Sequence, residues 1–225
     1  MGQSSAPNAP LVLASKSSQL SIGPGQAEFG VGFFGGHLRS LEGAMGYLRK
    51  KLGTLLSTLN GVDAHVLTAG VVLVVQFPFD AGTSSEDVLR QLLESQIRGD
   101  VPVDDVADVQ VRLGLKVSDT YYVSLMVNNY ESRSFQQIAT PASPVISIRP
   151  WEGDVTELGI QLVIDVNNRL AVRQAESDTA LDEGQLSEIL DVVAAVAAGA
   201  GPEFVHTGRI SSADIEATLG AHNES

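Results

Sequence analysis

The sequence predicts an α/β fold, a two-layer sandwich in which helices pack on a mixed sheet. Long stretches with the three- and four-residue spacing of amphipathic helices alternate along the chain with short runs that have the composition or the two-residue period of β-strands. An all-helical or all-strand fold would not contain both patterns. Among 225 residues, 44% are apolar and 18% are charged, which is enough apolar surface for a substantial core.

Three stretches predict helices. Residues 41–59 have one apolar stripe, and Ser40 precedes them as a residue type that caps helix N-termini. The second stretch opens with the capping-box spacing of Thr83-Ser84-Ser85-Glu86 and continues to about residue 97. The third starts at residue 182 and stops at a glycine, residue 199.

Five stretches predict strands. The run from Val71 to Phe79 is almost wholly apolar, which indicates a strand buried on both faces. Residues 109–117 alternate between apolar and polar types, as a half-exposed strand does. The remaining three are Tyr121–Asn129, Leu158–Val166 and Arg169–Ala175. The last two flank Asn167-Asn168, and they predict a tight hairpin because Asn tolerates positive φ.

These elements predict three parts along the chain. Residues 1–28 are rich in Ser, Pro, Gly and Ala and are expected to form a flexible arm, in which Leu11-Val12-Leu13 adds at most an edge strand. Residues 29–200 are expected to form a single α/β domain. Residues 201–225 are expected to be a tail with a short helix at 212–219.

Charge and composition limit the classes of partner and compartment. There are 14 basic and 27 acidic side chains, a net charge of −13, and residues 63–225 hold nine of the basic and 25 of the acidic ones. Such a surface repels phosphate backbones, so no nucleic acid partner is expected. The longest apolar stretch is far shorter than the roughly 20 residues of a membrane span, and no signal-peptide pattern is present. We therefore expect a soluble, cytoplasmic protein without a membrane partner.

Five segments between Val71 and Gly199 occur in a characteristic order. They are the apolar run ending in Gln76-Phe77-Pro78-Phe79, the helix after Ser84, Val101-Pro102-Val103-Asp104-Asp105-Val106, Tyr121 to Tyr130, and the closing strand pair with the last helix. In this order they resemble the C-terminal half of a condensation domain of nonribosomal peptide synthetases, in the chloramphenicol-acetyltransferase-like superfamily. The family usually has irregular or helical chain where residues 109–117 predict a strand.

The resemblance implies one half of a chloramphenicol-acetyltransferase-like fold and acyl transfer in secondary-metabolite assembly, with substrates bound to carrier proteins and no cofactor or metal. The family's catalytic signature is His-His-x-x-x-Asp-Gly, whose second His acts as base or positioning group. Here Ala64-His65-Val66-Leu67-Thr68-Ala69-Gly70 keeps that His and the Gly, but Ala replaces the first His and the Asp. His65 is therefore the candidate catalytic residue, with an ordinary loop histidine as the alternative.

The remaining constellations contain no catalytic or metal-binding pattern. The four histidines are scattered without metal-ligand spacing, cysteine is absent, and no nucleophile elbow occurs, so we expect no metal site, cofactor site or hydrolytic triad. Trp151, the sole tryptophan, is a candidate contact for a partner or ligand, or else a packed core residue.

Two functions stay open. One is a condensation-domain-like protein that lacks an intact catalytic motif and needs a partner half. The other is a non-catalytic binding or scaffolding module that self-associates through an exposed apolar face. Both predict a protein partner or a homo-oligomer.

Overall fold

The computed structural model describes residues 11–14, 18–23, 26–33, 40–60, 68–97, 99–117, 120–134, 153–170 and 183–223. The chain forms two compact units, Met1–Asp63 and Ala64–Ser225. The structure thus divides the chain near residue 63, whereas the sequence predicted one domain over residues 29–200. The difference arises because the sequence pattern shows that the helix at 41–59 has an apolar stripe but not what that stripe packs against.

The first unit contains a three-stranded antiparallel sheet where the sequence predicted a flexible arm. Its strands are β1 (Leu11–Ala14), β2 (Ser18–Gly23) and β3 (Gln26–Val31), in the order β1-β2-β3. In the register, Leu13 is opposite Leu20, which is opposite Phe29. The cross-strand apolar pair of Leu20 and Phe29 stabilises the sheet, but each strand is too short for its period to stand out from the Ser and Gly around it.

Helix α1 (Leu41–Asn60) completes the described part of the first unit. As predicted, Ser40 caps it, because the Gly43 amide donates a hydrogen bond to Ser40 Oγ at 3.1 Å. Its buried side chains include Met45 and Leu48. The Tyr47 ring packs edge-on against Phe33, with 6.5 Å between ring centroids.

The second unit is built on a four-stranded sheet. Its strands are β4 (Gly70–Pro78), β5 (Gln110–Val117), β6 (Tyr121–Ser134) and β7 (Asp154–Asn167), in the order β4-β7-β6-β5. The α/β class is confirmed. The predicted mixed sheet is wrong for the described strands, because all three pairings are antiparallel. Side-chain period shows which face a residue occupies and carries no information on strand direction.

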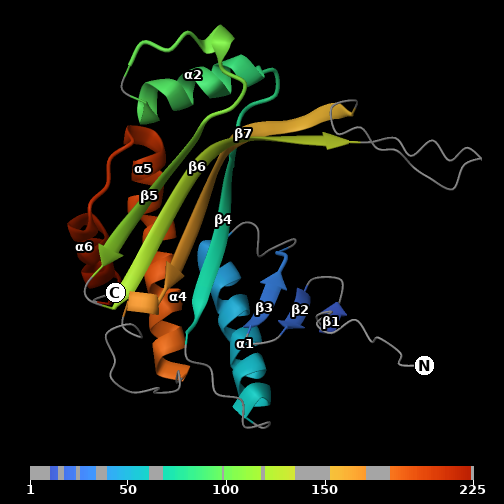
Figure 1. The fold of residues 1–225 in the computed structure, drawn as a ribbon, viewed down its shortest axis with the longest axis vertical. Coiled ribbons are helices and arrows are strands. Elements are labelled where there is room, and N and C mark those ends of the chain that lie inside the picture. Colours follow the sequence, from blue (N-terminus) through green and yellow to red (C-terminus); the bar gives the residue numbers. More distant parts are fainter. Residues whose placement is uncertain are drawn as a thin grey trace, which may run out of the picture. The chain divides into compact units, whose positions relative to one another are not determined.

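Four helices pack on one face of this sheet (Figure 1). They are α2 (Ser85–Gln96), α4 (Glu183–Ala198), α5 (Ala200–Thr207) and α6 (Ser212–Asn223), and a 3₁₀ turn, η2 (Val103–Asp105), lies against α2. Helix α4 packs on β4 and β7, α2 on β6 and β7, α5 on β7, and α6 on β5. We call this the helix-covered face.

The core lies between the sheet and these helices. Register places Val71, Val166 and Val123 in one row across the helix-covered face, and all three are buried. Helix α4 contributes Ile189 and Val193, which are fully buried. Burying each such side chain stabilises the fold by about 1.5–3 kcal/mol, so this layer holds the second unit together.

Two strand predictions are corrected by the structure. Strand β4 is not buried on both faces: it is at the edge of the sheet, and Val72 and Val74 are 62% and 51% exposed. The hairpin at Asn167-Asn168 does not form as predicted, because β7 is paired with β4 on one side and with β6 on the other up to Asn167. Arg169 and Leu170 are helical, and residues 171–175 of the predicted second strand lie outside the described residues. The Asn168 amide donates to the Ala69 carbonyl, and the Ala69 amide donates to Asn168 Oδ1. Asn168 therefore joins β7 to the start of β4, a long-range pairing that a local pattern cannot reveal.

The C-terminal residues form two helices of the second unit. The short helix predicted at 212–219 is present as α6, longer than expected. Helix α5 was missed, because Gly199, Gly201 and Pro202 indicate a helix stop. They lie at the start of α5, where a proline needs no amide partner. No single described helix is long and apolar enough to cross a membrane; only α4 and α5 taken together, with a 41° bend, meet that criterion.

Candidate functional site

The sequence-predicted site residues His65 and Trp151 both lie outside the described residues. The structure therefore leaves the catalytic prediction for His65 and the partner-contact prediction for Trp151 as predictions. The chemistry that can be described is on the second unit, at the sheet face opposite the helices and in a depression between α2 and α5.

The sheet face opposite the helices, which we call the open face, has no helix of the second unit packed on it among the described residues. Alternation along the strands defines its members. They are Val72, Val74 and Gln76 from β4, Gln161, Val163, Asp165 and Asn167 from β7, Tyr122, Ser124, Met126 and Asn128 from β6, and Arg112, Gly114 and Lys116 from β5.

A cationic cluster occupies one side of the open face. Arg112 is exposed, and its Nε donates a hydrogen bond to Ser124 Oγ at 3.0 Å. The Arg169 guanidinium, just past the end of β7, stacks on the Tyr122 ring, 3.8 Å from the ring centroid. A guanidinium over an aromatic face is held by cation–π attraction, so the ring positions Arg169 beside β6.

Gly114 makes room for this arrangement. A Cβ added to Gly114 would lie 2.3 Å from the Tyr122 hydroxyl and 3.0 Å from Cζ of its ring. The Tyr122 ring thus lies across β5 at Gly114, the one residue of this strand that has no side chain. Such coverage of a strand glycine by a cross-strand aromatic also helps hold the register.

The opposite side of the open face is apolar. Val74, Val163 and Met126 are neighbours in register across three strands. Val72 and Val74 are among the few large apolar side chains exposed on the described surface. Exposed β-branched side chains grouped on a sheet face are typical of a surface that another chain covers.

Buried acceptors lie between these two sides. Asn167 Nδ2 donates to Asp165 Oδ1 at 3.2 Å. The Asn167 and Asn128 side-chain oxygens are buried and accept no hydrogen bond from the described residues. Buried acceptors are nearly always paired in proteins, so both oxygens are suited to accept donors from a molecule bound on this face.

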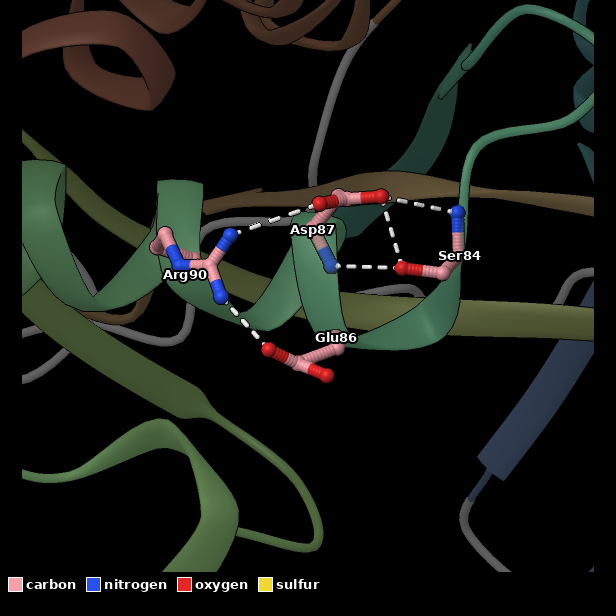
Figure 2. A network of polar contacts seen from close by, with 4 residues as sticks. All are labelled: Ser84, Glu86, Asp87 and Arg90. Carbon is pink, nitrogen blue, oxygen red and sulfur yellow. Dashed lines mark hydrogen bonds and ion pairs between the residues drawn. The ribbon is translucent and has the colours of Figure 1, made fainter.

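The depression between α2 and α5 has a volume of about 450 Å³ and is open to solvent. It is lined by Asp87, Arg90, Gln91, Glu94, Ser95 and His206. Figure 2 shows that two of these side chains belong to the start of α2: Asp87 binds Ser84, and Arg90 forms ion pairs with Asp87 and Glu86. The hydrogen bonds from Ser84 hold the pKa of Asp87 below its ordinary value of 3.8. Asp87 is thus a capping carboxylate rather than a general base, which needs a pKa near neutral.

Two tyrosines on β6 have raised pKa values without forming a site. Burial raises the pKa of the Tyr121 phenol above its ordinary value of 10.0, and the hydrogen bond from its hydroxyl to Glu188 raises it further. Burial has the same effect on Tyr130, whose hydroxyl donates to Glu157 at 2.8 Å. Both phenols stay protonated at neutral pH, and their hydrogen bonds tie β6 to α4 and β7.

Within the described part of the chain, no group of three or more His, Asp or Glu residues is placed to hold a metal ion. Comparison with protein-family models, with curated proteins and with solved structures finds no match to this chain. The geometry of the described residues is therefore the basis for a functional proposal.

The residues of the cationic cluster could not be selected from the sequence. Arg112 and Lys116 appear there only as outward positions of an alternating strand, and Arg169 as one side of a predicted hairpin. The one local signal is Gly114, which interrupts a strand pattern and indicates a close approach by another group.

Proposed function

We propose that this chain is a non-catalytic, self-associating binding module, and that the open face binds a partner protein with an acidic, amphipathic helix. The observation that carries the proposal is the composition of the open face: exposed valines from β4 on one side and the Arg112–Tyr122–Arg169 cluster on the other.

The size of the open face suits one helix. Neighbouring strands lie about 4.8 Å apart, so four strands span about 14 Å. A helix with its side chains is about 10 Å across. An antiparallel sheet can leave one face to solvent, and a helix from a partner laid on the open face would add a third layer.

The charges favour an acidic helix. Residues 63–225 contain only nine basic side chains, yet Arg112, Lys116 and Arg169 lie on or beside this one face. Asp165 is the one carboxylate among the open-face residues named above, and it accepts a hydrogen bond from Asn167. At physiological ionic strength the Debye length is about 8 Å, so a bound helix senses these three cations more than the acidic surface beyond the face. An apolar stripe on the helix would cover Val74 and Val163.

Binding of a designed peptide tests the proposal. The probe is a fluorescein-labelled amphipathic helix with Leu on one face and Glu on the other, and its reference has Gln in place of Glu. We expect fluorescence anisotropy to show salt-dependent binding of the Glu peptide. The Arg112→Gln/Arg169→Gln variant should bind about tenfold more weakly, as expected for two partly screened ion pairs.

The matched control is Arg90→Gln/Arg209→Gln, which removes the same charge from exposed positions outside the open face. This control should bind within about twofold of the parent. Equal binding of the Glu and Gln peptides, or unchanged binding by Arg112→Gln/Arg169→Gln with the fold intact by circular dichroism, would refute the proposal.

A second candidate is a condensation-domain-like half that acts on carrier-bound acyl groups together with a partner half. The order strand β4, helix α2, turn η2, strand β6, strand β7 and helix α4 supports it, because the resemblance implies this order, although the second strand of its closing pair is not among the described strands. Strand β5 at residues 110–117 counts against it, since the family usually has irregular or helical chain there. For either candidate we propose a cytoplasmic location, which fractionation of cells expressing the tagged chain would test.

A further inference from the structure

Strand β4 has an unpaired edge among the described residues. It lies at one end of the sheet, and its only described strand partner is β7. Exposed edges are normally protected by charged side chains, proline or bulges. At the other end of the sheet, β5 carries Arg112 and Lys116, both exposed. Strand β4 has no charged residue along its whole length, Gly70 to Pro78.

Part of β4 has a sequence that is symmetric about Leu73. Val71-Val72-Leu73-Val74-Val75 reads the same in both directions. If two copies of β4 pair antiparallel with Leu73 opposite Leu73, every valine in this segment meets a valine. A twofold axis requires such self-complementarity, because each surface must match itself.

The backbone of β4 is oriented for this pairing. The Asn168 amide donates to the Ala69 carbonyl, and the Phe79 amide donates to the Leu158 carbonyl. Since hydrogen-bonded and non-hydrogen-bonded positions alternate in antiparallel strands, the odd-numbered residues of β4 bond to β7. The amide and carbonyl groups of Gly70, Val72, Val74 and Gln76 therefore point away from β7, toward the free edge.

We infer that two copies of this chain pair through the β4 edges, with Leu73 on the twofold axis. This inference rests on the self-association in the proposed function and names its surface. In this register Val72 of one copy forms a hydrogen-bonded pair with Val74 of the other, and Gly70 pairs with Gln76. About eight backbone hydrogen bonds join the copies, ending at Pro78, which has no amide donor.

The pairing also accounts for the exposed valines. The twofold axis is perpendicular to the sheet, so the helix-covered faces of both copies lie on the same side. Val72 and Val74, 62% and 51% exposed in the single chain, then pack against the same residues of the second copy on the open face. The open faces merge into one continuous surface.

Cysteine cross-linking tests both the edge and the register. The chain has no cysteine, so Val72→Cys and Val74→Cys each introduce a single thiol. Opposed residues of an antiparallel pair are within disulfide range, whereas positions two residues out of register are about 7–8 Å apart. We expect a mixture of the two variants, carrying tags of different length, to form a disulfide heterodimer much faster than either variant forms a homodimer.

The cross-linking control is Val155→Cys. Val155 is 45% exposed on β7 beyond the end of β4, so a cysteine there should not cross-link.

A second variant, Val74→Pro, tests the backbone pairing. It removes an amide that points toward the free edge but no hydrogen bond to β7, so it should shift sedimentation from dimer to monomer with the circular dichroism unchanged. If the chain is a dimer but Val72→Cys and Val74→Cys show no preference for the heterodimer, the β4 edge pairing is wrong and self-association through another surface still holds. If the chain is a monomer at tens of micromolar, both the edge pairing and self-association are wrong. Peptide binding on the open face is a separate measurement and does not depend on either result.

Discussion

At the scale of single residues, glycines decide how closely the second unit packs. Gly208 follows α5 with φ of 66°, in the left-handed region, and its amide donates to the Phe204 carbonyl at 2.8 Å. A Cβ at this position would lie 2.1 Å from the Ser95 carbonyl oxygen. Gln96 Nε2 donates to the carbonyls of Phe204 and Val205 in the same region. The ends of α2 and α5 therefore meet at backbone distance because residue 208 has no side chain.

Gly208→Ala should therefore lower the free energy of unfolding by about 3 kcal/mol, from the left-handed backbone and the clash with a carbonyl that cannot move aside. Gly82→Ala is the matched control, because Gly82 also has positive φ (99°) but nothing within 4 Å of an added Cβ. It should cost only about 1 kcal/mol. Urea unfolding measures both, and equal losses would contradict the close approach.

At the scale of elements, helix α2 shows that tertiary packing can move a helix cap by one residue from the position that the sequence predicts. The sequence predicted a capping box opening at Thr83, with Glu86 as its acid. In the structure the cap is Ser84, and Asp87 is the reciprocal acid, one residue later. Helices α2 and α6 use the same device, since Ser211 and Asp214 exchange equivalent hydrogen bonds. Val88, Leu89 and Leu92 have to lie on the buried side of the helix. This requirement selects Ser84, rather than the neighbouring Thr83, as the residue that caps the helix.

Ser84→Ala should cost about 1 kcal/mol at pH 7. The pKa of Asp87 is lowered in the fold, so its contribution is present above the ordinary value of 3.8 and is lost as the pH falls through the folded-state pKa. The difference between Ser84→Ala and the parent should accordingly narrow in acid. Ser85→Ala, whose hydroxyl contacts Glu131 only at 3.4 Å, is the control and should be near neutral. A pH-independent difference in urea unfolding would argue against the Asp87 contribution.

At the scale of the whole molecule, charge and layering are distributed unequally. Basic residues exceed acidic ones in residues 1–62, five to two, whereas residues 63–225 are strongly acidic. The second unit has helices on one face of its sheet only, among the described residues. The open face and its cationic cluster, on an otherwise acidic unit, are the features on which the proposed binding function rests.

The choice between the two candidate functions can be made with His65→Ala. If the chain is a binding module, any acyl transfer from a carrier-bound thioester should stay within a few-fold of the parent, because Ala64 and Ala69 leave no partner in the motif to orient the imidazole. A general base would supply about 10²–10⁴-fold. A hundredfold loss of turnover, with circular dichroism unchanged, would instead favour the condensation-domain-like function.

The sequence by itself determined the α/β class, helix α1 with its cap at Ser40, strand β5 from its two-residue period, and the apolar composition of β4. Each depends on spacing within a few residues, which local physics dictates. Only the tertiary structure decided that β4 is an edge strand, that Asn168 binds Ala69 across 99 residues, and that Arg112, Tyr122 and Arg169 share one face. Those outcomes depend on strand order, and strand order is set by contacts between distant parts of the chain rather than by the pattern within any one of them.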